Sequence, residues 1–258
     1  MDGICLMLKA ICNLNLELMA VLNPTRADGR SFDALRTCEI TLDPMGFALS
    51  SLIIRTGRTK VLCSVCLKEG VPAWREGQGK GWLSAEYRLL PASTPNRQER
   101  ELIKLSGRTQ EIQRLIGRSL RAVLDMSAFA GKTFLIDCDV IEADAGTRTA
   151  SITGSWVALK LACIRLLKQG YLMHDPVKGQ VAAVSVGLKD GNSLLDLDYS
   201  EDSKVDVDLN VVMDTSGHLL ELQGTAEGKP FSRSELAKLL DIAEPGIQQL
   251  FASQLSVL

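Results

Sequence analysis

The 258-residue sequence lacks several features that mark common classes of protein. No apolar stretch approaches the roughly 20 residues that a membrane-spanning helix needs, so we expect no membrane span. Its two histidines, His174 and His218, form no evident catalytic triad. The formal net charge of −2 gives no overall attraction to nucleic acid, so any such binding must depend on local clusters of basic residues. No low-complexity linker divides the chain.

The seven cysteines also give no disulfide framework. Their number is odd, they are scattered, and most lie in apolar runs, as small buried residues do in a reducing compartment. Cys63 and Cys66 have the spacing of a zinc or redox pair, but they lie in a strand-like run in which residues three apart point to opposite faces. We therefore expect a cytoplasmic protein without metal or redox chemistry at these two residues.

Residues 1–23 are apolar but do not follow the pattern of a secretory signal peptide. Asp2, Lys9 and Glu17 interrupt the apolar residues, and we find neither a basic n-region nor a small-residue cleavage site. An internal methionine, Met19, precedes the first recognisable block of sequence. We interpret residues 1–25 as an N-terminal extension of unknown role, in which residues 1–18 are an addition or an early start.

What the sequence does contain is a marked separation of charge. Residues 88–121 hold eight basic residues against three acidic ones, whereas residues 189–208 hold seven acidic residues against two basic ones. We expect one basic and one acidic surface to flank a shared site.

The spacing of apolar residues predicts an α+β chain built from two similar halves, 26–170 and 171–258, that pack as one body. The first half is predicted to hold strands at 39–42, 47–55, 59–67 and 81–90, a helix at 107–126, a strand at 133–141 and a helix at 151–168. The second half is predicted to hold strands at 181–188, 193–198, 205–213 and 218–223 and a helix from 233 to about 254. Ser232 and Glu235 form a capping-box signature at the start of that last helix.

The turn at residues 144–149 is the most informative local feature. It follows an apolar strand, consists mostly of small residues, and precedes a helix. Such a turn directs backbone N–H groups and the Arg148 guanidinium to a common point ahead of a helix N-terminus, where an anion is held well. The pattern indicates a phosphate site, although an ordinary loop with a surface arginine fits the turn chemistry equally well.

Seven blocks of sequence follow one another from Arg26 to the C-terminus. They are Arg26-Ala-Asp-Gly-Arg30 with Leu35-Arg36, Gly79-Lys-Gly-Trp82 with Ala85-Glu-Tyr87 and Leu90-Pro91, Ser106-Gly-Arg-Thr-Gln-Glu-Ile-Gln-Arg-Leu-Ile-Gly-Arg118, Ile136-Asp-Cys-Asp-Val-Ile141, Gly146-Thr-Arg-Thr-Ala-Ser-Ile-Thr-Gly154, Glu201-Asp-Ser203 with Val207-Asp-Leu-Asn-Val-Val212, and Glu221-Leu-Gln-Gly-Thr225. In this order they resemble the ribonuclease PH family, and seven ordered blocks are far more specific than one short motif. The resemblance implies the ribonuclease PH fold, with two sheet-and-helix halves of ribosomal-protein-like βαβ units.

The resemblance also implies an activity, that of a phosphorolytic 3′→5′ exoribonuclease, a tRNA nucleotidyltransferase. Such an enzyme trims the 3′ ends of tRNA precursors, with rRNA as a further candidate substrate, using inorganic phosphate as co-substrate and releasing nucleoside diphosphates. The family's phosphate-binding positions correspond here to Arg108, Gly146, Thr147 and Arg148. Phosphorolysis brings a phosphate dianion to a negatively charged phosphodiester, and two arginines beside a helix N-terminus offset that repulsion.

Asp202 and Asp208 match the family's acidic pair, which binds a divalent cation or assists proton movement near the scissile bond. Because they are six residues apart, they would lie on the same side of an extended chain. Paired carboxylates suit Mg²⁺, with phosphate oxygens completing its coordination shell. The alternative is a solvated acidic strand edge. Asp196 and Asp198 are interpreted as plain solvated residues.

Arg97 and Arg100 match family arginines that bind the RNA backbone, and residues 91–100 are expected to form a loop. The resemblance further implies a homohexamer, a trimer of dimers, in which RNA-binding residues act across subunit interfaces.

The sequence departs from the family at three positions. Ala92 replaces an expected arginine, and Glu76 replaces a basic residue, which should weaken RNA affinity and its dependence on salt. Arg88 or Arg75 is expected to compensate. Ala145 stands where the family often has glycine and should still fit the turn.

Two classes of function stay open at this stage. One is the active phosphorolytic enzyme, and the other is a catalytically inactive exosome-like ring subunit that binds RNA. The joint presence of both phosphate-binding arginines and both aspartates favours the enzyme. A hydrolytic nuclease is a third possibility, but it needs a denser carboxylate cluster for two metals.

Overall fold

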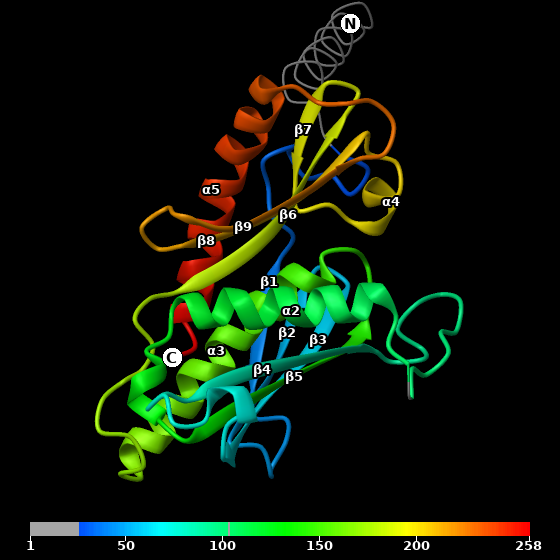
Figure 1. Ribbon diagram of the computed structural model, residues 1–258. Helices are drawn as coiled ribbons and strands as arrows, with labels where there is room; N and C mark the ends of the chain where they lie inside the picture. Colours follow the sequence, from blue (N-terminus) through cyan, green and yellow to red (C-terminus); the bar gives the residue numbers. More distant parts are fainter. Residues whose placement is uncertain (1–25, 103) are drawn as a thin grey trace, which may run out of the picture.

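The computed structural model of the protein describes residues 26–258 except residue 103, so the predicted extension at 1–25 lies outside the described residues. Two β-sheets form the two ends of the molecule, and helices α2 (Gly107–Ala122) and α3 (Thr147–Lys168) lie between them (Figure 1). The α+β architecture with two halves is confirmed.

The first sheet has five strands in the order β1-β2-β3-β5-β4. Neighbouring strands are antiparallel except β4 and β5, which are parallel. Helix α2 lies in the connection between these two strands, as a parallel pair requires. The strands are β1 (Cys38–Leu42), β2 (Ser50–Thr56), β3 (Thr59–Glu69), β4 (Trp82–Leu89) and β5 (Lys132–Glu142).

The second sheet has four antiparallel strands in the order β7-β6-β8-β9. These strands are β6 (Val181–Lys189), β7 (Asn192–Leu195), β8 (Val207–Asp214) and β9 (Leu219–Ala226). Helix α5 (Arg233–Leu255) packs on this sheet through buried residues that include Leu239, Ile247 and Phe251. The capping box is confirmed, because the Ser232 N–H donates to the Glu235 carboxylate at 2.6 Å and the Ser232 hydroxyl accepts from the Glu235 N–H.

Helix α3 forms the centre of the molecule. It contacts β2 and β3 of the first sheet and β6 of the second, and its residues are buried on nearly every side. It is the one helix in the described part of the chain that is long and apolar enough to cross a membrane. However, 72% of its most apolar 18-residue stretch is buried, as in the core helix of a globular protein. Gly154 lets this helix approach β2, because a Cβ there would lie 2.7 Å from Ile54 Cγ2.

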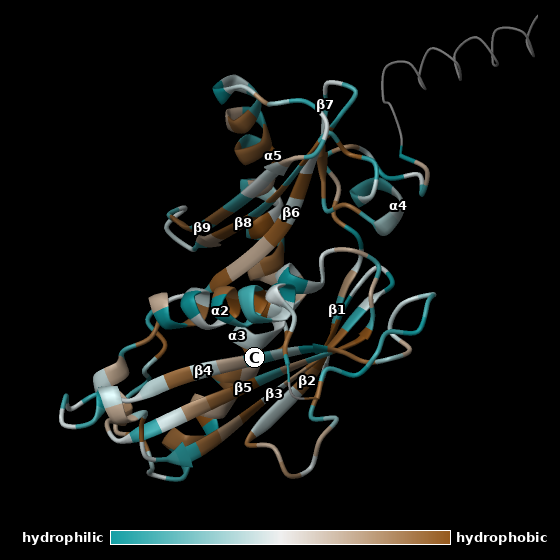
Figure 2. Ribbon diagram, turned by 45° about the vertical axis from the view of Figure 1, so that its right-hand side comes forward, coloured by the Kyte–Doolittle hydropathy of each residue, from teal (hydrophilic) through white to brown (hydrophobic). Residues whose placement is uncertain are grey.

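The core is continuous between the two halves. Ala183 of β6 and Val212 of β8 belong to the same buried cluster as Leu52, Phe134 and Trp156 of the first half. Helix α2 carries alternating hydrophobic and hydrophilic bands in Figure 2, as an amphipathic helix at the junction should. The two halves therefore hold their facing surfaces in a fixed relation, which matters for any site built between them.

Several predicted boundaries were wrong in informative ways. Helix α3 begins at Thr147 rather than Ser151, and α2 ends at Ala122, before a separate 3-10 helix at Met126–Phe129. A short helix, α4 (Tyr199–Asp202), lies where the sequence predicted only strand and loop. As predicted, Cys63 and Cys66 point to opposite faces of β3, since the first is buried and the second exposed.

Candidate active site

The phosphate turn, which we define as residues 144–146, joins β5 to α3. Ala145 and Gly146 both have left-handed backbones, with φ of 57° and 64°. The Thr59 hydroxyl fixes the turn to β3, because it donates to the Ala145 carbonyl at 2.6 Å and accepts from the Asp144 N–H at 2.9 Å. Gly146 is the N-cap of α3, and no side chain caps the helix there. The turn therefore leaves a helix N-terminus open toward an anion.

Thr147 and Arg148 lie in the first turn of α3 rather than in the loop. The Thr147 side chain is buried, and its hydroxyl lies 2.8 Å from that of Tyr87 in β4. Burial raises the pKa of Tyr87, so its hydroxyl stays protonated and available for this hydrogen bond. Sequence reasoning did not find Tyr87 as a partner, although the residue lies inside one of the matched blocks. The Tyr87 hydroxyl fixes the side chain of Thr147, the residue before Arg148.

Arg148 reaches across the junction between the halves. Its Nη1 donates to Gln223 Oε1 of β9 at 3.1 Å and lies 3.6 Å from Glu111 Oε2 of α2. Arg108 lies in the first turn of α2, where Ser106 caps the helix and the arginine is exposed. The charges of Arg108 and Arg148 act on Asp202 and Asp208, so one residue of the predicted basic segment and two of the predicted acidic segment lie near one another at this site.

Asp202 and Asp208 come together by a route that the sequence did not predict. Asp202 is the last residue of α4 and Asp208 lies in β8, so the chain between them is not extended. Burial and the nearby Asp202 charge raise the pKa of Asp208 from its ordinary 3.8 to about 6. Burial likewise raises the pKa of Asp202, while Arg108 and Arg148 oppose the shift. The two carboxylates therefore share one partly desolvated site with the arginines.

The acidic pair is suited to hold a divalent cation together with substrate. Among the residues that the structure describes, Asp208 Oδ1 is buried without a hydrogen-bond partner, and Asp208 Oδ2 has only a long contact of 3.5 Å with Asn210 Nδ2. No group of three or more His, Cys, Asp or Glu residues that could hold a metal occurs among residues 26–102 and 104–258. A cation here would therefore need further oxygen ligands from phosphate. Mg²⁺ is usually bound in this way, by one or two carboxylates together with substrate phosphates.

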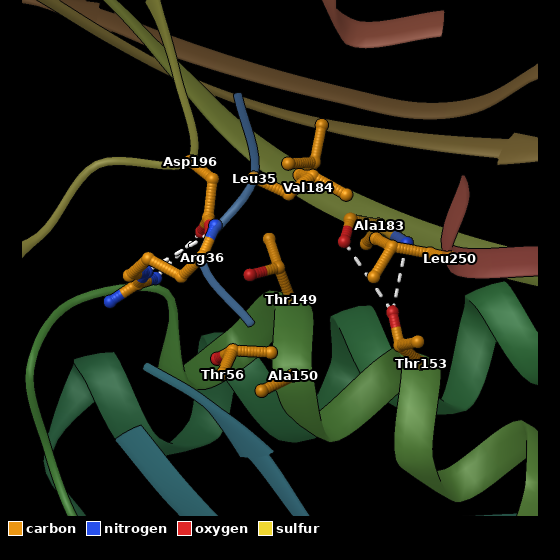
Figure 3. A pocket seen from close by; sticks show the side chains of 10 residues that line it. All are labelled: Leu35, Arg36, Thr56, Thr149, Ala150, Thr153, Ala183, Val184, Asp196 and Leu250. Carbon is orange, nitrogen blue, oxygen red and sulfur yellow. Dashed lines mark hydrogen bonds and ion pairs between the residues drawn. The ribbon is translucent and has the colours of Figure 1, made fainter. Parts of the chain in front are cut away.

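Asp196 is not a solvated residue, so that interpretation was wrong for it, whereas Asp198 is half-buried and has a capping role that was not predicted. Asp196 is buried and pairs with Arg36, whose Nε and Nη2 donate to its two carboxylate oxygens at 3.0 and 2.6 Å (Figure 3). Asp198 caps α4 and accepts from the Glu201 N–H. The burial of Asp196 depends on its pairing with Arg36, which lies far away in the sequence.

The predicted RNA-binding arginines lie apart from regular structure. Arg97 and Arg100 are exposed in the segment between β4 and α2. Of the two proposed compensating residues, Arg88 donates to the Tyr87 carbonyl at 2.8 Å, and Arg75 lies over the Trp82 ring at 5.4 Å. Both already have partners within the fold, so neither is singled out as a replacement.

Comparison with known proteins decides the family. The models of the 3′ exoribonuclease family match this chain at residues 34–165 for domain 1 and 179–246 for domain 2. A ribonuclease PH from Prochlorococcus marinus is 74% identical over 233 residues, covering 90% of this chain and 96% of the relative. The chain belongs to the ribonuclease PH family. Another member, from Synechococcus elongatus, is 54% identical over 90% of this chain and 98% of its own length.

Solved structures of this family's fold agree with the architecture. A chain of the Archaeoglobus fulgidus exosome, solved with RNA bound to the active site, superposes with a TM-score of 0.77. It is 21% identical and covers 91% of this chain and 94% of its own, so the likeness concerns the fold alone. The predicted family and fold are therefore confirmed, and the roles of individual site residues stay predictions.

Proposed function

We propose that this protein is a phosphorolytic 3′→5′ exoribonuclease that removes nucleotides from the 3′ ends of tRNA precursors, with inorganic phosphate as co-substrate. One observation carries the proposal. Two arginines and an open helix N-terminus face two carboxylates with raised pKa values across the junction between the halves. That arrangement suits a reaction in which a free phosphate and a phosphodiester must be brought together.

The phosphate-binding residues lower the cost of that encounter. An oxygen of inorganic phosphate attacks the last phosphodiester phosphorus, and the bond from that phosphorus to the preceding 3′ oxygen breaks. A nucleoside diphosphate leaves, and the 3′ oxygen of the shortened RNA takes up a proton. Arg108, Arg148 and the N-terminus of α3 place positive charge where negative charge accumulates. Gly146 allows close approach of the backbone to the phosphate.

Asp202 and Asp208 would hold the divalent cation, which we assign as Mg²⁺. When bound, Mg²⁺ supplies positive charge to phosphate oxygens during the displacement. Asp208 has a second capacity, because a pKa of about 6 lets its carboxyl hold a proton near neutral pH. That proton is suited to transfer toward the departing 3′ oxygen. The unpartnered Asp208 Oδ1 is the atom that either role would use.

RNA binding and assembly are the finer parts of the proposal. Arg97 and Arg100 are exposed on a segment that leads into α2, so they can reach the RNA backbone ahead of the site. We further assign a homohexamer, built as a trimer of dimers, and tRNA precursors with rRNA as a second substrate. Large apolar side chains that are fully or mostly exposed, such as Phe47 and Met173, support an assembly that covers them.

The activity is tested with a tRNA that carries a short 3′ extension. Purified protein is incubated with this RNA and Mg²⁺, with and without inorganic phosphate, and the released nucleotides are identified by chromatography. Phosphate-dependent shortening with nucleoside diphosphates as products is expected. Nucleoside monophosphates, or shortening that ignores phosphate, would contradict the proposal. Sedimentation of the same preparation measures whether the protein is a hexamer.

A further inference from the structure

We propose that Arg36 and Asp196 form a positioning pair that aligns the phosphate turn with the acidic helix α4. Neither residue belongs to the phosphate-binding or acidic sets described above, and the inference rests on the proposed function. The pair joins the segment before β1 to the residue that follows β7, and it contacts the phosphate turn directly.

Arg36 and Asp196 make more hydrogen bonds than a simple salt bridge does. Asp196 Oδ2 accepts from the Arg36 backbone N–H at 2.8 Å and from its Nε at 3.0 Å, while Oδ1 accepts from Nη2 at 2.6 Å. The remaining arm, Nη1, donates to the Asp144 carbonyl at 2.6 Å. A planar guanidinium is needed to make these contacts at once, because its donors have a fixed fork geometry.

On the first-half side, Arg36 sets the position of the phosphate turn. Its Nη1 holds the Asp144 carbonyl, and its Nη2 fills the space beside Gly146, where a Cβ would lie only 2.8 Å away. Ala145 occupies a left-handed backbone conformation, which is strained for a residue other than glycine and persists where the surroundings fix it. Arg36 is one of the groups that supply this restraint.

On the second-half side, Asp196 sets the position of the acidic helix. Asp196 also has a left-handed backbone, with φ of 53°, and stands two residues before the cap of α4. Arg26 holds the same segment, because it donates to the Asp196 carbonyl at 2.9 Å and to the Glu201 carboxylate. Glu201 is adjacent to Asp202 in α4, so the restraint reaches the acidic pair.

The side chains of Arg36 and Asp196 are only 5% and 8% exposed, so the pair is not placed to contact substrate. Figure 3 shows Arg36 and Asp196 lining a small cavity together with Thr149 and Leu35. Its volume of about 10 Å³ admits about one water molecule and excludes a phosphate ion. The pair must therefore act through the turn and through α4.

Stability alone does not account for this arrangement. A buried ion pair is weak evidence for stabilisation, because apolar side chains of similar volume often replace one without loss. Apolar side chains would leave the Asp144 carbonyl without its donor and would no longer link the two sides of the site. Since displacing a reacting group by about 1 Å costs on the order of a hundredfold in rate, alignment is a sufficient reason for the pair.

The test compares two variants of the pair with a structural control. Asp196→Asn keeps the shape but removes the carboxylate, and Arg36→Lys keeps the charge but loses the fork. The control is Gln254→Leu, since Gln254 is buried and joins α5 to the Thr153 and Val181 carbonyls without touching the phosphate turn. For each protein we would measure the melting temperature, the affinity for RNA, and kcat and KM for inorganic phosphate.

Both pair variants are expected to raise the phosphate KM and to lower kcat/KM for phosphate by about 10- to 100-fold, with RNA affinity unchanged. Gln254→Leu should lower the melting temperature while leaving the phosphate KM as in the wild type. A phosphate KM that stays at the wild-type value in Asp196→Asn, or a fully active Arg36→Lys, would overturn the inference. The proposed function would still stand in that case, provided that the wild-type protein trims RNA with phosphate. Wild-type protein that trims without phosphate would overturn the proposed function itself.

Discussion

The two sides of the site differ in how completely their functional groups are satisfied. On the phosphate side, Thr147 is bonded to Tyr87 and Arg148 donates to Gln223, so these groups are held in place before any ligand arrives. On the acidic side, Asp208 keeps a buried oxygen without a partner and a pKa of about 6. The phosphate side is organised in advance. On the acidic side, the buried charge of Asp208 is unfavourable, and a bound cation or a proton would neutralise it.

The largest expected loss of activity comes from a change on the phosphate side. Arg148→Ala should lower kcat for phosphate-dependent trimming by roughly 10²- to 10³-fold, because it removes a donor aimed at developing charge. RNA binding should be largely kept, which gel-shift titration would show. Arg165→Ala is the matched control, since Arg165 lies near the other end of α3 and bonds to the Leu49 carbonyl. Equal loss of activity in both variants would contradict a specific role for Arg148.

Asp208→Asn should separate function from stability on the acidic side. We expect trimming to fall by about 10²-fold or more, as for loss of an acid–base group. At pH 8 the free energy of unfolding should rise by about 1–3 kcal/mol, because the variant no longer buries a charge whose pKa is raised to about 6. Asp206→Asn is the control and should change neither quantity. An Asp208→Asn protein that is less stable at pH 8 would refute the electrostatic account.

The pH dependence of the same residue gives a further test. Because the folded-state pKa of Asp208 lies above its ordinary 3.8, its cost to stability is full above about pH 6 and disappears below about pH 4. The stability advantage of Asp208→Asn should therefore vanish on acidification, as followed by urea unfolding at several pH values. A pH-independent advantage would point to packing rather than charge.

Cation and proton should compete for the acidic pair. If ionised Asp208 is a ligand, trimming falls as the pH drops below about 6, and additional Mg²⁺ moves the midpoint of that fall to lower pH. Rates measured across pH at two Mg²⁺ concentrations would show this. A midpoint that does not move with Mg²⁺ would favour proton transfer as the role of Asp208.

The smallest expected effect on activity concerns Glu111, which lies beside Arg148 on the phosphate side. Its Oε2 lies 3.6 Å from Arg148 Nη1, so its charge competes with phosphate for that arginine. Glu111→Gln should lower the phosphate KM by up to about fivefold, the effect of a weak, partly exposed ion pair. Glu39→Gln, which removes a distant pair with Arg55, should have no such effect. A raised KM in Glu111→Gln would show that Glu111 positions Arg148 instead.

Sequence reasoning recovered those features that depend on local pattern. The strands, the amphipathic α2 and the capping box at Ser232 follow from spacing that any globular fold obeys. The start of α3 was misplaced because Thr147, Thr149 and Ser151 are weak helix formers that favour turns. In the fold, the Thr149 and Ser151 hydroxyls bond to the Gly146 and Thr147 carbonyls, which satisfies both side chains within the helix.

Features that depend on distant partners were missed. A buried aspartate such as Asp196 has the same local pattern as a solvated one, and it is the ion pair with Arg36, 160 residues earlier, that compensates its burial. Likewise, the spacing of Asp202 and Asp208 suggested a strand, although α4 and the start of β8 bring them together. Long-range ion pairs of this kind leave no periodic signal in a single sequence.

The central claim is that phosphate reacts in this site rather than merely binding there. Inorganic phosphate labelled with ³²P would be supplied with unlabelled RNA and Mg²⁺, and the released nucleotides would be separated and counted. The account predicts one labelled nucleoside diphosphate for each nucleotide removed, with the label in the β-phosphate, and a rate of formation that is roughly 10²- to 10³-fold lower with Arg148→Ala. Unlabelled nucleoside monophosphates released at the same rate would contradict it.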